Sequence, residues 1–515
     1  MDKLFKLVFS KKLLSIISFL FQIFILAAGF VWFKEYFAYV YWVQLVVCAG
    51  LIIYEMQLQK NPAFQLTWIC LVALAPTFTI LLYLLVRFDT VGKRISRRLN
   101  YIVKTTNRHL PQKPDAAEQL EELHPRMGGL ANYLRDTCGF PVYQNTDVKY
   151  YPLGELMFEE LKKDLHNAKK FIFVEFFIIH HGIMWSSIHE ILKEKAAQGV
   201  EVRVMYDGMG CVNLLPRDYH KTLEEEGILC HPFAPVYPLL SSSQNNRDHR
   251  KIVVVDGEVA YTGGVNLGDE YINRIERFGH WKDTAIRVTG DAVDSFSMMF
   301  LQLWNASERK KGFNEEEYLF YLTGSTRREK IDTKGFVIPF GDSPLDEENT
   351  GERVYMDLLH TAQKYVHIVS PYLIPSSEMR ETLKYTAKRG VEVILLLPHI
   401  PDKPYVKAVA RTYYSELIRG GVKIYEYTPG FVHAKMSISD DTRAVVGTIN
   451  HDFRSLFLHY ECAALMIDCP VVPVIETDFQ QALKLSQRVT LADYMKISVI
   501  SRFFGYLLRL FAPLL

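Results

Sequence analysis

The chain opens with three long apolar runs before its pattern changes. The runs are Leu13–Phe33, Tyr39–Tyr54 and Ala63–Val86. The first and third are long enough to cross the hydrocarbon core of a bilayer, and the second is marginal. Tryptophan residues lie near the ends of the runs, as is typical of membrane interfaces, which disfavours the alternative of buried core helices. The pattern therefore predicts membrane-anchoring helices over residues 1–88.

Basic residues flank this region on both sides and indicate its orientation. Four lysines lie before the first run, and the segment KRISRR begins at Lys93. Positive charge favours the cytoplasmic side, so both flanks should be inside and the number of crossings should be even. We expect two spans in a multi-pass protein, with one run lying in the interface or re-entering. The part of the chain that follows these runs is then cytoplasmic. Residues 89–144 predict a basic linker that either contacts anionic headgroups or is simply solvated.

Beyond residue 144, buried-strand runs alternate with helical stretches, and this order occurs twice. KFIFVEFFII at residues 170–179 is followed by a helical stretch and then by GVEVRVMYDG from Gly199. YVHIVSPYL at residues 365–373 is followed in the same way by GVEVILLLP from Gly390. The pattern predicts an α/β fold of two duplicated lobes, residues 145–328 and 329–490, with mixed sheets flanked by helices. Residues 491–515 predict an amphipathic helix, either interfacial or docked on the core.

Composition narrows the class of partner. The net charge is +1, which argues against a protein that binds nucleic acid through bulk charge. The chain has seven cysteines but no Cys-x-x-Cys pair, no H-E-x-x-H and no set of Cys and His residues at zinc spacing. We therefore expect neither a disulfide framework, nor a metal site, nor a cofactor. A homo-oligomer is left open.

One motif stands in both lobes with identical internal spacing. DHRKIVVVDGEVAYTGGVN begins at Asp248, and VHAKMSISDDTRAVVGTIN begins at Val432. Each contains H-x-K-x-x-x-x-D followed by Gly and Asn. The candidate catalytic residues are His249, Lys251, Asp256, His433, Lys435 and Asp440, and the candidate phosphate ligands include Asn266 and Asn450. Such a repeat in register is poorly explained by chance.

These residue types suit chemistry at a phosphodiester. Lysine charges and asparagine donors can hold the anionic oxygens as charge builds up. One imidazole can attack phosphorus, and a second, near its ordinary pKa, can protonate the leaving alcohol. On a regular strand His and Lys of each H-x-K share a face, whereas Asp256 and Asp440 face away. We therefore expect the two aspartates to tie the turns that follow them, with a direct role at the site as the alternative.

The paired motifs resemble the phospholipase D superfamily and, with the membrane runs, the bacterial cardiolipin synthases within it. The resemblance implies two lobes packed about a pseudo-two-fold axis and a location in the bacterial cell (inner) membrane, with the catalytic region cytoplasmic. It also implies His249 as nucleophile, His433 as general acid and base, and transfer of a phosphatidyl group between two phosphatidylglycerol molecules through a phosphohistidine. The residue after the motif glycine is often serine in this family. Gly264 therefore loses a hydroxyl contact to phosphate, while Thr448 can keep it.

Each catalytic imidazole also needs a group that holds its other ring nitrogen. By the same resemblance, Asp283, which follows the first motif, and Glu461, which follows the second, are candidates for this role. Asp452 and Glu270 are the fallback candidates. Other readings are a phospholipase D hydrolase, a phosphatidylserine synthase, or a membrane scaffold that binds lipid without turnover. A nuclease is disfavoured by the apolar runs and the neutral charge.

Overall fold

The computed structural model describes residues 24, 37–58, 61–76, 79–80, 82–83, 90–110, 114–234, 245–307, 315–322, 330–346 and 348–512. The chain forms two compact units. One comprises residues 1–94, 236–245 and 507–515, and the other comprises residues 95–235 and 246–506. The second unit contains both copies of the repeated motif.

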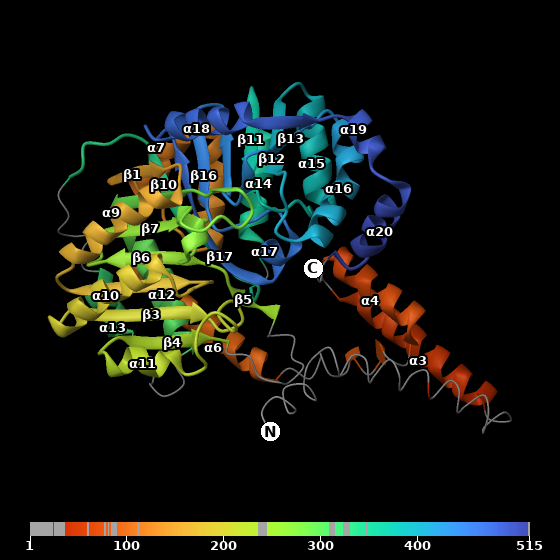
Figure 1. Cartoon of the computed structure of the whole chain (residues 1–515), viewed down its shortest axis with the longest axis horizontal. Helices are drawn as coiled ribbons and strands as arrows, with labels where there is room; N and C mark the ends of the chain where they lie inside the picture. Colours follow the sequence, from red (N-terminus) through yellow and green to blue (C-terminus); the bar gives the residue numbers. More distant parts are fainter. Residues whose placement is uncertain are drawn as a thin grey trace. The chain divides into compact units, whose positions relative to one another are not determined.

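The first lobe is built on a seven-stranded mixed sheet (Figure 1). Buried β-branched and aromatic residues give its central strands, which pair in parallel from β2 to β4 and antiparallel from β2 to β1. In spatial order the strands are β1 (Thr146–Tyr151), β9 (Ala285–Gly290), β7 (Val259–Gly263), β6 (Lys251–Val255), β2 (Phe171–Phe176), β3 (Glu201–Asp207) and β4 (Leu229–Phe233).

The second lobe repeats this order and adds one edge strand. Its strands are β10 (Phe336–Asp342), β17 (His459–Ile467), β16 (Arg443–Gly447), β15 (Met436–Ser439), β11 (Tyr365–Val369), β12 (Glu392–Pro398), β13 (Lys423–Tyr427) and β18 (Ser486–Val489). Each strand of the first sheet thus has a counterpart at the same position in the second, with the same parallel or antiparallel pairing. The predicted α/β lobes with mixed sheets are confirmed, whereas the boundaries given for them stay predictions.

Helices connect the strands and cover the sheets. Those of the first lobe are α9 (Gly154–Asn167), α10 (Ile183–Ala197), α11 (Tyr219–Glu225), η4 (Asp269–Ile272), α12 (Val293–Ser307) and α13 (Glu316–Leu322). Those of the second lobe are α14 (Thr350–Thr361), α15 (Ser377–Lys388), α16 (Pro404–Arg419), α17 (Phe453–Phe457), α18 (Val472–Lys484) and α19 (Leu491–Lys496). Helix α12 is buried from Val293 to Ala306 because it contacts β6 and β7 of one sheet and β10 of the other.

Two short parallel strand pairs join the lobes next to the repeated motifs. Strand β5 (Arg247–Asp248) pairs with β17 of the second lobe, and β14 (Gly430–Val432) pairs with β8 (His280–Lys282) of the first. The His-x-Lys triplets follow β5 and β14 directly and end where β6 and β15 begin. Contrary to the expectation from a regular strand, these triplets are therefore linkers from an interlobe strand pair into the sheet.

Most of the described residues in the segment predicted as a linker, residues 89–144, are helical. The helices are α6 (Thr90–Thr106), η1 (Asn107–His109), α7 (Pro114–Leu123), α8 (Pro125–Asn132) and η2 (Tyr133–Thr137). Ile102, Leu120 and Leu134 are fully buried, and from Ile95 onward these helices belong to the unit that contains the repeated motif. The apolar residues of the segment are sparse along the sequence, but helical spacing gathers them on one face.

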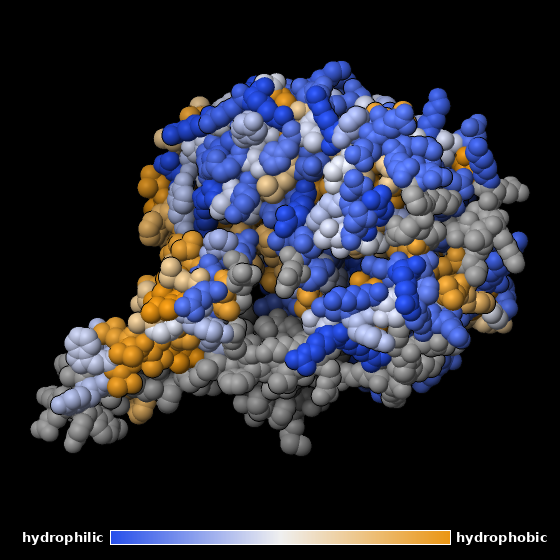
Figure 2. All heavy atoms as spheres, turned by 180° about the vertical axis from the view of Figure 1, so that it is seen from behind, coloured by the Kyte–Doolittle hydropathy of each residue, from blue (hydrophilic) through white to orange (hydrophobic). Residues whose placement is uncertain are grey.

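The N-terminal unit contains α3 (Phe37–Gln57) and α4 (Pro62–Leu74), which cover the second predicted run and the start of the third. The first predicted run lies outside the described residues apart from Phe24. Many apolar side chains of α3 and α4 are exposed, including Trp42, Val46 and Leu66, and they gather on the surface in Figure 2. A search of the described part of the chain found no helix with both the length and the apolar character needed to cross a membrane.

The last helix, α20 (Val499–Arg509), is amphipathic as the sequence indicates. Gly505 is buried against α16, where a Cβ atom would lie 2.7 Å from the carbonyl oxygen of Ala408. On other sides Val499, Ile500 and Phe503 are exposed. The helix therefore docks on the protein through one face and presents apolar side chains on others, whereas its interfacial role stays a prediction.

The motif aspartates fasten the turns that contain them to the sheets, and Asp440 also ties its own turn through an ion pair with Arg443 at 2.7 Å. The Asp256 carboxylate accepts the backbone N–H groups of residues 169, 170 and 171 at 2.7, 2.7 and 2.9 Å. Asp440 does the same to residues 363, 364 and 365 at 2.8, 2.8 and 3.0 Å. Each turn thus holds the start of the adjacent strand, β2 or β11. Burial acts to raise the pKa of Asp440, but these hydrogen bonds lower it overall.

We predict that Asp440→Asn lowers the free energy of unfolding by about 2 kcal/mol, because an amide turns an N–H group toward three N–H donors. Denaturant unfolding of the full chain measures this, with Asp147→Asn on the exposed face of β1 as the control. Since the folded pKa of Asp440 is depressed, the difference between the wild type and the variant should be full at neutral pH. It should shrink as the pH falls through that pKa. Equal stability of the two proteins would contradict this role.

Candidate functional site

The first imidazole is placed by the register of β5 against β17. Arg247 pairs with His459 and Asp248 with Tyr460, so the next residue, His249, lies beside Glu461. The His249 N–H group donates to the Tyr460 carbonyl at 2.9 Å. The ring nitrogen Nδ1 then lies 2.8 and 2.9 Å from the two carboxylate oxygens of Glu461.

The second imidazole is placed in the same way by the pairing of β14 with β8, with the roles of the two lobes exchanged. Val432 pairs with Lys282 in the register of β14 against β8, and the His433 N–H group donates to the Lys282 carbonyl at 2.7 Å. Nδ1 of His433 lies 2.6 Å from Oδ2 of Asp283. Backbone pairing, which no side-chain motif reveals, therefore sets both histidine–carboxylate contacts.

The orienting carboxylates are thus exchanged between the lobes. The sequence placed Asp283 after the motif of His249 and Glu461 after that of His433, but each carboxylate contacts the imidazole of the other lobe. All four side chains are at least nine-tenths buried. Each lobe contributes one imidazole and the carboxylate that holds the other.

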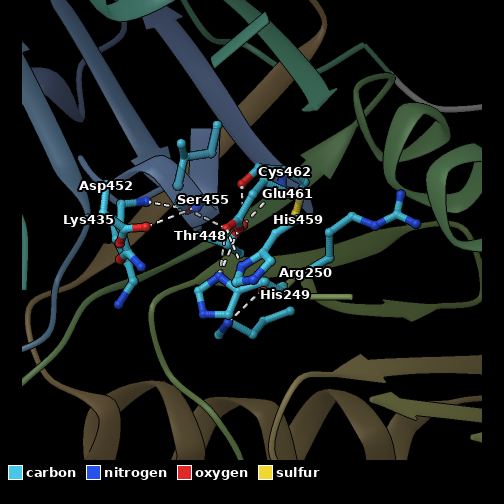
Figure 3. A network of polar contacts seen from close by, with 12 residues as sticks. His249, Arg250, Lys435, Thr448, Asp452, Ser455, His459, Glu461 and Cys462 are labelled. Atoms are coloured by element: carbon cyan, nitrogen blue, oxygen red, sulfur yellow. Dashed lines mark hydrogen bonds and ion pairs between the residues drawn. The ribbon is translucent and has the colours of Figure 1, made fainter. Parts of the chain in front are cut away.

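Two hydroxyl groups hold the Glu461 carboxylate in place (Figure 3). Thr448 and Ser455 both donate to it, while their own oxygens accept the backbone N–H groups of Cys462 and Asn450 at 3.0 and 2.8 Å. The Thr448 hydroxyl proton is therefore directed at Glu461. The sequence did not predict this contact, and the predicted role of Thr448 as a phosphate ligand stays a prediction.

Asp283 is accommodated by a glycine instead of by a hydroxyl. A Cβ atom on Gly264 would lie 2.0 Å from Oδ1 of Asp283 and 3.0 Å from the carbonyl oxygen of His433. The same Oδ1 accepts the Thr284 N–H group at 2.9 Å. Gly264 is thus needed for the close approach of the His433–Asp283 pair, which explains why this position differs from Thr448 in the second lobe.

Both motif lysines are buried beside the imidazoles. Nζ of Lys251 donates to the carbonyl of His249 at 2.6 Å, and Nζ of Lys435 lies 2.9 and 3.0 Å from the two ring nitrogens of His433. Burial lowers the pKa of Lys251 to about 8 and that of Lys435 to about 7. Two confined positive charges of this kind attract an anion.

The two histidine–carboxylate pairs differ electrostatically. Burial and then the Lys435 ammonium lower the pKa of His433 to about 4. Burial acts to raise the pKa of Asp283, but His433 and Lys435 lower it overall, so Asp283 is ionised. Burial and then Lys251 lower the pKa of His249 well below its usual range, and burial raises that of Glu461 to about 8. An imidazolium is therefore better supported at His433.

The asparagines lie close to the pairs with different partners. Oδ1 of Asn266 accepts the Ile178 N–H group at 3.2 Å, and its Nδ2 donates to the Tyr271 hydroxyl at 2.8 Å. The Tyr271 ring packs edge-on against His433. Asn450 is buried, and its Oδ1 has no hydrogen-bond partner among the described residues.

Four carboxylates from the prediction lie outside this arrangement. Asp256 and Asp440 hold strand starts, as described above. Of the fallback candidates, Asp452 caps α17 by accepting the Ser455 N–H group at 3.0 Å, and Glu270 pairs with Arg277 at 3.2 Å. Neither contacts a motif imidazole.

Sequence analysis missed a third imidazole and the hydroxyl of Ser455. The His459 ring lies beside that of His249, with their centroids 5.5 Å apart, and both rings face Glu461 in Figure 3. His249, His459 and Glu461 offer ligand atoms within 4.8 Å of one another, a group that could hold a metal ion. The signal was present as His-x-Glu at the start of β17, because residues two apart share a face.

Comparison with known proteins agrees with this geometry. The family model "Cardiolipin synthase, PLD-like domain" matches residues 161–304 and 355–483. A cardiolipin synthase from Halalkalibacterium halodurans is 31% identical over 91% of this chain and 92% of its own. One from Staphylococcus aureus is 31% identical over 87% and 90%. A protein of Streptococcus mutans described as uncharacterized is 44% identical over 90% of this chain and all of its own.

The fold also resembles a solved structure. A phosphatidylserine synthase from Haemophilus influenzae superimposes with a TM-score of 0.54 at 16% identity, over 71% of this chain and 93% of that one. At this identity the likeness shows a shared fold. Taken with the two matched segments and the relatives aligned over most of their length, the chain belongs to the cardiolipin synthase family of PLD-like proteins.

Proposed function

We propose that this phosphatidyltransferase makes cardiolipin and glycerol from two molecules of phosphatidylglycerol. The observation that carries the proposal is the pair of buried imidazoles, each held at Nδ1 by a carboxylate and each accompanied by a buried lysine. Such a site offers a nucleophile, an acid and two phosphate-binding cations. The relatives named cardiolipin synthase support the choice of substrate.

In the first step, Nε2 of His249 attacks phosphorus of the donor lipid. The Nδ1–H group points to Glu461, so in the neutral ring the lone pair lies on Nε2. The bond from phosphorus to the glycerol oxygen breaks, and His433 transfers its proton to that oxygen. Free glycerol leaves, and the phosphatidyl group stays on His249.

In the second step, the roles at His433 reverse. Its neutral ring removes the proton from the glycerol hydroxyl of a second phosphatidylglycerol, and that oxygen attacks phosphorus. The phosphorus–nitrogen bond to His249 breaks, which gives cardiolipin and restores the site. Lys251, Lys435 and the amide of Asn450 stabilise the phosphate oxygens in both steps.

The electrostatic difference between the pairs supports this assignment of roles. An acid must become an imidazolium, and the ionised Asp283 favours that state at His433. The phosphodiester anion adds negative charge beside His433 and raises its pKa on binding. His249 has the carboxylate with the raised pKa, so its ring is more readily kept neutral for attack.

The location proposed for the enzyme is the bacterial cell membrane, with its catalytic unit in the cytoplasm. Support comes from the apolar runs in residues 1–88 with basic flanks and from the exposed Val499, Ile500 and Phe503 of α20. Residues on α20 are well suited to contact acyl chains and anionic headgroups at the interface, because Arg502 and Arg509 accompany the apolar side chains.

A lipid product assay tests the reaction. The full chain in phosphatidylglycerol vesicles with EDTA and serine should give cardiolipin and glycerol in equal amounts. His249→Ala and His433→Ala should each lower the rate by about 1,000-fold or more, since a nucleophile or an acid is lost. His399→Asn, which changes a half-exposed histidine paired with Glu426, serves as the matched control and should retain full activity.

Other products would contradict the proposal in identifiable ways. Phosphatidic acid as the main product would make the protein a hydrolase, and phosphatidylserine would make serine the acceptor. Binding of the vesicles without any turnover would support a lipid-binding scaffold.

The pH profile should be a narrow bell centred between about pH 7 and 8. As the pH rises through about 8, Glu461 loses its proton, and its carboxylate can then stabilise the positive charge that builds up on the neutral His249 ring as it attacks. The lysines act in the opposite direction, because they are charged below their pKa values of about 7 and 8 and lose the charge above them. Measuring kcat/KM from pH 5 to 10 checks this. A plateau extending to pH 10 would contradict the lowered lysine pKa values.

A further inference from the structure

His459 is a buried imidazole that the proposed reaction does not use. Its ring is buried at the first position of β17, and neither Nδ1 nor Nε2 has a hydrogen-bond partner among the described residues. A neutral imidazole always carries one N–H donor and one acceptor, and leaving both unpaired in the protein interior is unfavourable. The two ring nitrogens of His459, which have no hydrogen-bond partner in the described part of the chain, therefore indicate a ligand-binding position.

The surroundings of His459 supply partners for such a ligand. His459 and Glu461 are two residues apart on β17 and share a face, so Nδ1 of His459 lies 3.9 Å from Oε1 of Glu461. The His249 ring lies next to them, and one ligand atom from each residue falls within 4.8 Å of the others. The hydroxyl groups of Thr448 and Ser455 donate hydrogen bonds to the Glu461 carboxylate.

We propose that His249, His459 and Glu461 form a binding site for a zinc-like divalent cation. Two imidazoles and a carboxylate are a ligand set that Zn²⁺ favours, with water in the fourth position. The hydroxyl donors on Glu461 would be the outer partners that fix the carboxylate. Mg²⁺, which prefers an octahedral set of oxygen ligands, does not fit these three groups.

Charge near the site makes its occupation reversible. Burial first, and then the positive charges of Lys251 and Lys435, lower the pKa of His249, and the same charges weaken the binding of a dication. Arg454 and Lys251 act on His459 in the same way, after burial. The cation therefore binds and dissociates as its free concentration changes, and in this way it would regulate the enzyme.

Occupation of the site would inhibit the enzyme, an inference that rests on the proposed function. The cation takes the Nδ1 lone pair of His249, so the proton of the neutral ring moves to Nε2. Nε2 then has no lone pair with which to attack phosphorus. Because the lysines and Asn450 are not ligands of the cation, lipid can still bind while the nucleophile is blocked.

Competition between the full chain and a zinc-sensitive chelating dye tests the site directly. After EDTA treatment and desalting, the wild type should bind one Zn²⁺ per chain. His459→Phe, which keeps an aromatic ring against Phe177, should bind at least about 10-fold more weakly, as should Glu461→Gln. His399→Asn should bind as the wild type does. Zn²⁺ should raise the Tm of the wild type but not that of His459→Phe.

The rate of lipid turnover provides the second measurement, with each variant compared with its own rate in EDTA. Zn²⁺ should lower kcat of the wild type without changing KM, Mg²⁺ should have no effect, and His459→Phe should resist Zn²⁺. Equal zinc affinity of the wild type and both ligand variants would overturn the site. Zinc binding without lipid turnover in EDTA would instead remove the proposed function, while turnover without zinc binding would remove only this inference.

Discussion

Two short parallel strand pairs, β5 with β17 and β14 with β8, hold each histidine-bearing segment against the opposite lobe. A parallel register advances both chains together, so the residue after each pair meets the residue after its partner. That rule brings His249 to Glu461 and His433 to Asp283. Neither lobe alone contains an imidazole with its carboxylate, and the site exists only where the lobes meet.

This construction buries six ionisable groups, which are the two imidazoles, the two lysines and the two carboxylates of the site. Burial lowers the pKa values of the lysines and imidazoles and raises that of Glu461, whereas at Asp283 the effect of burial is outweighed by His433 and Lys435, which lower the pKa. Such confined charge is costly for folding and useful at a phosphodiester, whose negative charge compensates it. The lobes differ in small ways, with Gly264 in place of Thr448 and Asp283 in place of Glu461. These differences suffice to give two similar imidazoles different chemical roles.

Much of the fold and part of the site could be predicted from the sequence. The repeated strand runs and the Gly-Val-Glu-Val element depend on local spacing, and the structure confirms them as strands and turns of the α/β lobes. The partners of the imidazoles could not be predicted, because the pairing of β5 with β17 joins segments that are about 210 residues apart in the sequence. The contact of Thr448 with Glu461 was missed for the same reason, since it depends on packing across β16 and β17.

His459 shows the limit of reading one motif at a time. The pattern His-x-Glu obeys the same alternation as His-x-Lys, but it lies outside the repeat and so carried no weight. Similarly, the thin apolar pattern of residues 89–144 concealed helices whose few apolar side chains are fully buried. In both cases the three-dimensional neighbours decide what the residue does.

The crossed pairing can be tested most directly by trapping the protein-bound intermediate. The donor would be a radiolabelled phosphatidyl ester of p-nitrophenol, whose leaving group needs no protonation, so the first step needs His249 and its carboxylate but not the acid His433. After rapid quenching, Asp283→Asn should accumulate label on the peptide that contains His249, because the second step is impaired. Glu461→Gln should form little label. The reverse pattern, with label in Glu461→Gln and none in Asp283→Asn, would contradict the exchange of carboxylates between the lobes.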